Sequence, residues 1–327
     1  MSNNSKQAFD TCQGAYYHDT GYKELFSYPE LVQQLIEGFF PPEIAALMDF
    51  KTLQIHSGHY ITPLFEEKIE DVVWSVNIQY DGQTQSVYLY MLMEFQSSDD
   101  KRMALRFMHY VAGFYSQLIK QEKIKPSDPL PPVFPIVLYN GNARWQAPTQ
   151  MSDMIHSVPG FLQVYQPQLQ YYLVDEGAYS EQELDARHSP ISGVFYLENA
   201  KNHTEIMQAV EKVVANLQNH PDRARLDKVI TRWFKRYLQR INAQLKLDTL
   251  NSLTEEKGML AQNIEQWIEQ ERRESLQQGM QQGKLEMALE MVRQLNVSVK
   301  KAAEVASVSV KDLMDYIKQH DQDHSKS

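Results

Sequence analysis

The sequence contains very little cysteine, no long apolar segment and no excess of positive charge. Its 327 residues include a single cysteine, Cys12, so the chain can form neither an internal disulfide nor a cysteine-rich zinc site. No apolar run approaches the ~20 residues that a membrane span needs. The polar N-terminus lacks the apolar core of a signal peptide. These absences predict a protein without a membrane segment, for which a reducing cytoplasm is the simplest location.

The charge balance of the chain is acidic. Lysine and arginine together number 32 against 42 aspartates and glutamates, which gives a formal net charge of -10. Proteins that coat nucleic acid without selectivity are usually basic, because phosphate neutralisation dominates their affinity. A nucleic-acid function therefore requires either a local basic surface or a metal ion that bridges acidic residues to phosphate.

Common nucleotide and hydrolase motifs are also missing from the sequence. No serine lies in a G-x-S-x-G context, so a hydrolase triad of that kind has no support. No Walker or dinucleotide-binding glycine pattern occurs, so neither ATP nor NAD is indicated.

The region before residue 200 alternates between strand and helix patterns, which is typical of an α/β layer. Residues 71–80 and 87–96 are rich in apolar, β-branched and aromatic residues, and Asp81-Gly82 between them suits a tight turn. The continuous apolar character of 87–96 predicts a central, buried strand. The other expected elements are strands at 133–139 and 170–174, a connector or weak strand at 53–63, and helices at 16–40 in two segments, 42–48 and 101–121.

Helical patterns dominate from about residue 201 to the end, with amphipathic segments at 203–219 and 221–247. The glycines of the string QQGMQQGK at 277–284 weaken a helix. We therefore expect a small terminal unit after them, with helices at 285–295, 299–306 and 309–318. The predicted organisation is a loose leader at 1–15, an α/β core at 16–200, a helical extension at 201–275, and a helical module at 276–327 that could join copies of the chain.

An acidic pair stands at the ends of two predicted strands. Asp71 opens the first strand, and Glu94 and Gln96 lie two residues apart at the end of the next, on one face of its pleat. A carboxylate in a buried apolar strand is unfavourable unless it is paired, hydrogen-bonded or metal-bound. Asp71 and Glu94 could share a Mg²⁺ ion, which prefers hard oxygen ligands. The alternative is structural: Glu94 would pair with a cation such as Lys101 or Arg102.

The best local basic surface lies on the predicted helix 221–247. Six cations fall within an arc of roughly 140°, opposite the apolar face of that helix. Such a stripe could follow DNA phosphates without reading sequence, although the solvated face of a packed helix gives the same pattern. The six residues are Arg225, Lys228, Arg232, Lys235, Arg236 and Arg240.

Four segments of the chain carry a resemblance to a known family. They are HDTGYKELFSYPELVQQLIEGFFPPE, DVVWSV, YLYMLMEFQSSDDKRMALRFMHYVAGFY and LPPVFPIVLYNGNARWQAP. In this order they resemble the Rpn family of recombination-promoting nucleases, a bacterial group also labelled YhgA-like putative transposases. The resemblance covers most of the chain. It implies a restriction-endonuclease-like PD-(D/E)XK core, a mixed sheet flanked by helices, and metal-dependent DNA cleavage linked to recombination.

The resemblance also assigns residues to a site. Asp71 matches the family's metal-binding aspartate, and Glu94 and Gln96 match its E-x-Q, which replaces the E-x-K of the wider superfamily. The carbonyl of Phe95 would be a further ligand of Mg²⁺ or Mn²⁺. Gln96 can hydrogen-bond a water molecule but supplies no positive charge. The candidates for that missing charge are Lys23 and Arg106, and those for an acidic residue on the first helix are Glu24 and Asp19.

Three hypotheses follow. The resemblance favours a Mg²⁺-dependent DNA endonuclease of little sequence specificity, in which Asp71 and Glu94 hold the metal and Gln96 orients the attacking water. The alternative is a non-catalytic DNA-binding or regulatory partner in transposition or recombination that keeps the nuclease fold. A third hypothesis is a structural α/β protein whose buried acids form ion pairs and bind no divalent ion.

Overall fold

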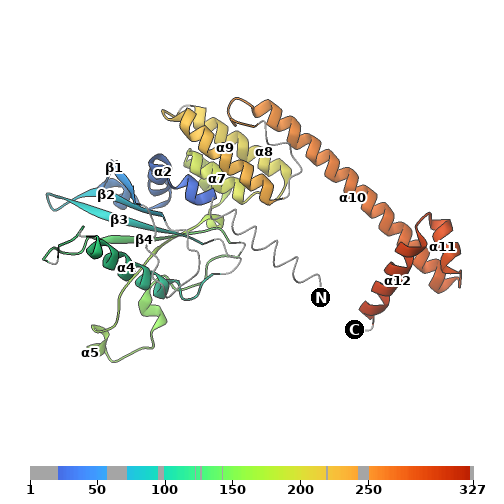
Figure 1. The fold of residues 1–327 in the computed structure, drawn as a ribbon, viewed down its shortest axis with the longest axis horizontal. Helices are drawn as coiled ribbons and strands as arrows, with labels where there is room; N and C mark the ends of the chain where they lie inside the picture. The colour runs from blue at the N-terminus through green and yellow to red at the C-terminus, as the bar shows by residue number, and fades with distance from the viewer. Residues whose placement is uncertain are drawn as a thin grey trace. The chain divides into compact units, whose positions relative to one another are not determined.

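The computed structural model describes residues 21–56, 72–94, 99–121, 123–125, 127–141, 143–218, 220–241 and 250–324. Its internal contacts divide the chain into two units, Met1–Ala261 and Gln262–Ser327. The first unit contains a sheet with helices, and the second is helical (Figure 1).

The first unit is built on a five-stranded mixed sheet in the order β1-β2-β3-β4-β5. Strands β1, β2 and β3 pair antiparallel, whereas β3, β4 and β5 pair parallel. This confirms the predicted α/β class. The connector or weak strand expected at 53–63 overlaps the end of β1. The strands are β1 (Met48–His56), β2 (Val72–Tyr80), β3 (Gln83–Glu94), β4 (Val133–Tyr139) and β5 (Tyr172–Asp175).

A tight turn joins β2 to β3, as the sequence predicts. Asp81 and Gly82 both have positive φ, at 52° and 71°. Two left-handed residues form the hairpin turn whose twist matches that of the strands it joins, and aspartate followed by glycine is a preferred pair there. The turn fixes the register of the hairpin, in which Tyr80 pairs with Gln83 and Val72 with Met91.

Helices cover both faces of the sheet. The predicted helix 101–121 forms as α4 (Met103–Lys120), and residues 21–25 are also helical. The remaining helices of this unit are α2 (Pro29–Phe39), α3 (Pro42–Leu47), α5 (Gly160–Gln163), α6 (Glu181–Ala186), α7 (Pro190–Glu198), α8 (His203–Gln218) and α9 (Arg223–Arg240), with short 3-10 turns at Met151–Met154 and Glu176–Ala178.

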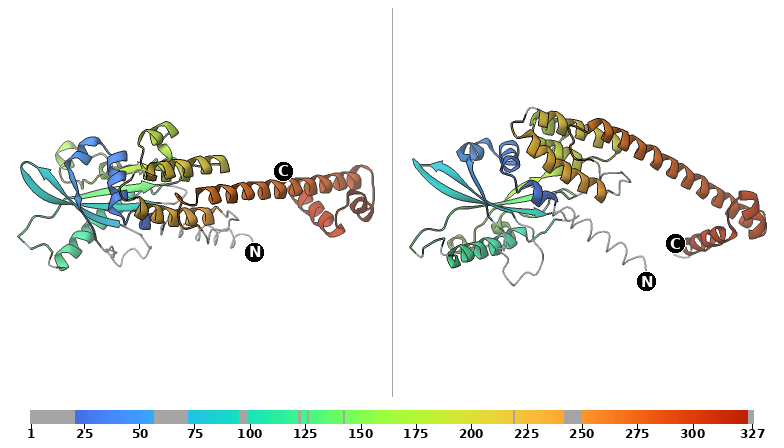
Figure 2. Two further views of the ribbon diagram at one scale, coloured as in Figure 1. Left: turned by 90° about the horizontal axis from the view of Figure 1, so that it is seen from above. Right: turned by 45° about the horizontal axis from the view of Figure 1, so that its top comes forward.

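Successive side chains of a strand point to opposite faces of the sheet, and each face has its own buried core. Val73, Tyr90 and Leu92 pack with Phe107 of α4 in one buried cluster. The neighbouring Trp74 belongs to the other face, where its indole N–H donates to the carbonyl of Phe26 at 2.9 Å. Helix α4 therefore covers one face, and α2 and α7 lie on the other (Figures 1 and 2). Apolar residues at helical spacing make α4 amphipathic, which is why it docks along one stripe.

The second unit is a set of helices around a small core of its own. It contains most of α10 (Lys257–Gln294), together with α11 (Val299–Ala306) and α12 (Val310–His324). Ser298 caps α11 by accepting from the backbone N–H of Lys301, and Ser307 ends it in a left-handed conformation. Buried alanines hold α11 close to α10, with Leu313 of α12 completing the core.

The predicted break at the Gln/Gly string is wrong. Helix α10 runs without interruption through residues 277–284, so the expected helix 285–295 is its last part. A glycine inside a helix costs only ~1 kcal/mol relative to alanine, and the intervening glutamines and methionine are good helix formers. None of the helices in the described part of the chain is both long and apolar enough to cross a membrane.

Candidate functional site

The three parallel strands end together at one edge of the sheet. Glu94, Tyr139 and Asp175, the last residues of β3, β4 and β5, pair in register across this edge. Ligands in α/β sheets commonly bind outside the carboxyl ends of the strands. We call this row of strand ends the carboxyl edge.

One member of the predicted acidic pair, Glu94, lies at this edge. Glu94 closes β3, and Asp71 precedes Val72, the first residue of β2, which pairs with Met91 of β3. Asp71, Phe95, Gln96 and Asp19 lie outside the described residues, so their roles stay predictions. Within the described part of the chain no group of three or more histidines, cysteines or carboxylates is arranged to hold a metal ion.

Asp175 fastens the loop after β4 to the end of β5. Its carboxylate accepts from Arg144 Nη1 at 2.6 Å and from the backbone N–H of Trp145 at 3.1 Å. Arg144 also donates to the carbonyl of Gly141. A Cβ at Gly177 would stand 2.1 Å from Arg144 Nη2, so a side chain there would displace the guanidinium from its present position. The carboxyl edge is thus braced by an ion pair that spans its loops.

A second carboxylate at this edge, Glu176, is buried with only 1% of its surface exposed. The Tyr22 hydroxyl donates to Glu176 Oε2 at 2.7 Å, and Asn140 Nδ2 donates to the same hydroxyl at 3.3 Å. Glu176 Oε1 has no hydrogen-bond partner among the described residues. Burial, reinforced by the nearby charge of Glu198, raises the pKa of the Glu176 carboxyl well above its ordinary value. This shift favours the neutral form of Glu176 over the charged form.

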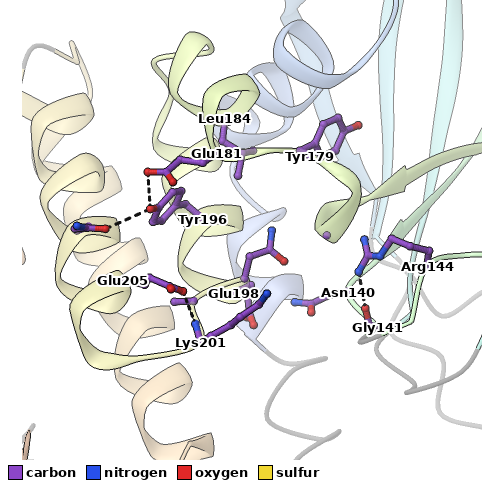
Figure 3. A pocket seen from close by; sticks show the side chains of 14 residues that line it. Asn140, Gly141, Arg144, Tyr179, Glu181, Leu184, Tyr196, Glu198, Lys201 and Glu205 are labelled. Atoms are coloured by element: carbon purple, nitrogen blue, oxygen red, sulfur yellow. Dashed lines mark hydrogen bonds between the residues drawn. The ribbon is translucent and has the colours of Figure 1, made fainter.

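Glu198, at the end of α7, pairs with Arg240, at the end of α9. Arg240 Nη2 donates to Glu198 Oε2 at 2.5 Å and Nη1 to Oε1 at 3.2 Å, a bidentate arrangement. Glu198 and Asn140 also line a polar cavity of about 740 Å³, together with Arg144 and Lys201 (Figure 3). The cavity therefore adjoins the buried network of Tyr22, Glu176 and Asn140.

The basic residues of α9 face acidic residues of the N-terminal helices. Arg232 Nε donates to Glu24 Oε1 at 2.5 Å, and Arg236 donates to the other oxygen of Glu24. Arg225 pairs with Glu30 at 2.7 Å. Together with Arg240, all four arginines of the predicted stripe are thus engaged in ion pairs that tie α9 to other elements. Lys228 and Lys235 form no ion pair in the part of the chain that the structure describes.

The comparison with protein families identifies the chain at the family level. The family described as "Putative transposase, YhgA-like" matches residues 16–228, which include the whole sheet and its carboxyl edge. The chain belongs to this family. No solved structure matches it significantly.

Proteins similar to this YhgA-like chain carry names of two kinds. The recombination-promoting nuclease RpnC of Escherichia coli (strain K12) is 33% identical over 127 residues, which cover 38% of this chain and 39% of RpnC. The recombination-promoting nuclease RpnD of Escherichia coli O157:H7 is 29% identical over 126 residues, which cover 38% of this chain and 45% of RpnD. The inactive recombination-promoting nuclease-like protein RpnE of strain K12 is 30% identical over 124 residues, which cover 38% and 39%. The matched segment therefore spans less than half of each relative.

Three of the supporting site residues predicted from the sequence lie within the described part of the chain, namely Arg106, Lys23 and Glu24. Arg106 Nη1 pairs with Asp100 Oδ2 at 2.7 Å and its Nε donates to the Tyr110 hydroxyl at 3.2 Å, so Asp100 balances its charge. Lys23 lies in the helical segment 21–25, where its carbonyl accepts from Ser27 Oγ. Glu24, in the same segment, faces the arginines of α9. Their expected roles near a metal stay predictions.

Sequence reasoning missed the buried network of the YhgA-like chain, because its members are far apart in sequence. Tyr22 and Glu176 are 154 positions apart, and α7, which carries Glu198, was not predicted. One local signal was available, since Asp175 ends the apolar strand β5 and Glu176 directly follows it, where charged side chains are unexpected unless they have partners.

Replacing Tyr22 with phenylalanine should destabilise this family member by about 1–3 kcal/mol, because Glu176 Oε2 would lose its buried donor. Urea denaturation followed by tryptophan fluorescence measures the change. Tyr165→Phe is the matched control, since that tyrosine is largely exposed and should tolerate loss of its hydroxyl. Equal stability of wild type and Tyr22→Phe would contradict the hydrogen bond.

Replacing Glu176 with glutamine should change how stability depends on pH. The folded-state pKa of Glu176 is raised above its ordinary value of 4.5. Its contribution is therefore fully present below that value and is lost as pH rises through the raised pKa. Glu176→Gln removes this loss, so between pH 5 and pH 9 the free energy of unfolding should fall less for the variant than for wild type. If the free energy of unfolding changed with pH equally in the variant and in wild type, the raised pKa of Glu176 would be contradicted.

Proposed function

We propose that this chain is a metal-dependent DNA endonuclease of the PD-(D/E)XK type that promotes recombination and has little sequence specificity. One observation carries the proposal: the apolar and largely buried second half of β3 ends in Glu94 at the carboxyl edge, beside the strand that Asp71 precedes. The mixed sheet with helices on both faces is consistent with that fold. RpnC and RpnD are named recombination-promoting nucleases, and these names support nucleic-acid cleavage as the reaction class.

The residues of the proposed site fit a hard divalent cation. Two carboxylates, Asp71 and Glu94, and the carbonyl of Phe95 form an all-oxygen donor set, which Mg²⁺ and Mn²⁺ prefer. A bound cation of this kind would supply Lewis-acid polarisation of a phosphate oxygen. The side chain of Gln96 would position the attacking water by hydrogen bonding.

The positive charge that the E-x-K lysine supplies elsewhere must come from another group or be dispensable. Arg106 is paired with Asp100, and the four arginines of the predicted stripe on α9 each face a carboxylate. Of the six cations in the predicted stripe, Lys228 and Lys235 remain for contact with the backbone phosphates of DNA. Such contacts would orient the DNA without reading its sequence.

The alternative is a non-catalytic DNA-binding or regulatory partner in recombination that keeps the fold. It is favoured by the neutral Gln96, and by the similarity to RpnE, whose name describes an inactive protein. Both functions would use the same DNA-binding surface. They differ only in whether the protein cleaves the DNA that it binds.

Cleavage of supercoiled plasmid in Mg²⁺, Mn²⁺ or EDTA tests the proposal. The nuclease function predicts nicked and then linear plasmid in either metal and none in EDTA. Folded protein that binds the plasmid without cleaving it in either metal would overturn the nuclease function and support the non-catalytic partner.

A further inference from the structure

A loop that ends in bulky apolar side chains projects from the sheet beyond α4. Its tip is the short helix α5 and the turn that follows it (Figure 1). Phe161 is 75% exposed, Val164 75% and Tyr165 79%, the three largest values among the large apolar side chains of the described chain. We call these three residues the apolar tip. Exposed apolar groups gathered in this way commonly mark a contact site.

The apolar tip is presented by a hydrogen-bonded backbone. At the base of the loop, the N–H of Met151 donates to the carbonyl of Leu169 at 2.9 Å, and Tyr171 donates to Thr149 at 3.2 Å. At the tip, the N–H of Tyr165 donates to the carbonyl of Leu162 at 3.1 Å. The loop thus holds its apolar side chains outward in a defined turn, although burying them would be favourable by roughly 1.5–3 kcal/mol each.

The base of the loop lies at the amino end of β5, where Tyr171 directly precedes the first residue of the strand. Met151 and Tyr171 are buried in the same cluster as Tyr90 and Leu92, the residues of β3 that lead to Glu94. The backbone N–H of Gln146 donates to Asp99 Oδ2 at 3.0 Å, which ties the chain after β4 to the chain that precedes α4. The chain thus leaves the carboxyl edge after β4 and returns at the amino end of β5, so the apolar tip projects from the amino-end side of the sheet (Figure 1).

The loop is also unusual in its charge. Residues 154–174 contain no aspartate, glutamate, lysine or arginine, although these make up 23% of the chain. Glutamines stand at four positions instead, namely Gln163, Gln166, Gln168 and Gln170. On a chain of net charge -10, this is a long stretch in which no carboxylate repels an approaching polyanion.

We propose that the apolar tip stacks on unpaired or unstacked bases of DNA, so that the chain prefers DNA in which base stacking is interrupted. The inference rests on the proposed function in taking DNA as the substrate. Aromatic rings stack on any base, and apolar wedges of this kind open base steps in DNA-bending proteins. Glutamine amides close to the tip match the donor and acceptor groups of base edges.

A projecting tip fits DNA better than it fits a second copy of the chain. Stable interfaces between proteins bury about 800 Å² on each partner, with 20–30 residues a side. Three side chains on a narrow loop bury less than that, because an aromatic residue contributes about 150–250 Å². Insertion between bases needs no larger surface.

The test compares the full-length chain with its Phe161→Ser/Tyr165→Ser variant in EDTA, where binding is separated from cleavage. Fluorescence anisotropy measures affinity for a forked DNA and for a fully paired duplex, and 2-aminopurine at the fork reports unstacking. The variant should bind the fork roughly tenfold more weakly, since stacking on one base contributes about 1–3 kcal/mol, and should lose the 2-aminopurine signal. A comparable loss of affinity for the fully paired duplex would overturn the proposed preference for unstacked bases.

Tyr80→Ser is the matched control, because Tyr80 is 65% exposed at the β2–β3 hairpin and should leave DNA affinity unchanged. Unaltered fork affinity in the double variant would overturn the proposal, as would absence of DNA binding by wild type. A wild-type dimer that the double substitution dissociates in sedimentation would assign the tip to self-association instead. Tip-dependent binding without plasmid cleavage in Mg²⁺ would refute only the nuclease function.

Discussion

Replacing Asp71 with asparagine or Glu94 with glutamine is expected to lower the rate of metal-dependent DNA cleavage by roughly a thousandfold. Each substitution removes one anionic oxygen donor while keeping the size of the side chain. A loss of about 4 kcal/mol of transition-state stabilisation corresponds to this factor. Initial rates of plasmid nicking at saturating Mg²⁺ measure the effect.

Asp81→Asn is the matched control for this pair of variants. It makes the same carboxylate-to-amide change at the hairpin end of β2, and asparagine accepts the positive φ of that position. The control should cleave like wild type. All three variants should unfold in EDTA near the wild-type temperature, because neutralising one of two neighbouring carboxylates relieves repulsion. Equal rates for Glu94→Gln and wild type would remove Glu94 from the site.

Replacing Arg240 with methionine is expected to destabilise the fold by about 3 kcal/mol. Glu198 is almost completely buried, so loss of its bidentate partner removes two charge-assisted hydrogen bonds from a buried carboxylate. Arg232→Met should cost less than about 1 kcal/mol, because Glu24 is more exposed and keeps Arg236 as a partner. Urea denaturation of both variants gives the comparison.

A second substitution separates the two possible causes of that loss. If the unpaired charge is responsible, adding Glu198→Leu to Arg240→Met should recover much of the lost stability, since a buried ion pair and an apolar pair are often of similar stability. A double variant less stable than Arg240→Met would show instead that packing around α7 and α9 is what was lost.

The sequence predicted those elements whose pattern is local. Strand β2 is rich in β-branched and aromatic residues, β3 has a continuous apolar run in its second half, Asp81-Gly82 specifies its own turn, and α4 has one apolar stripe. Each of these signals lies within ten or twenty residues. Glycines at 279 and 283 misled the prediction, because a local propensity of ~1 kcal/mol does not decide a helix of 38 residues.

The surroundings of the site required the fold. Spacing along α9 identified an array of cations, but not that Glu24, Glu30 and Glu198 face its arginines. The pairing of Tyr22 with Glu176 joins residues that are 154 positions apart in the sequence. A sequence pattern can report which face of an element a residue occupies, and only tertiary packing determines which charge it meets.

Binding of Mn²⁺, measured by the electron paramagnetic resonance signal of the free ion during titration, tests the central claim most directly. The account predicts that wild type and Asp81→Asn bind one Mn²⁺ per chain, that Mg²⁺ competes for it, and that Asp71→Asn and Glu94→Gln lose it. Binding of Mn²⁺ by all four proteins alike, or by none of them, would contradict a metal site held by Asp71 and Glu94.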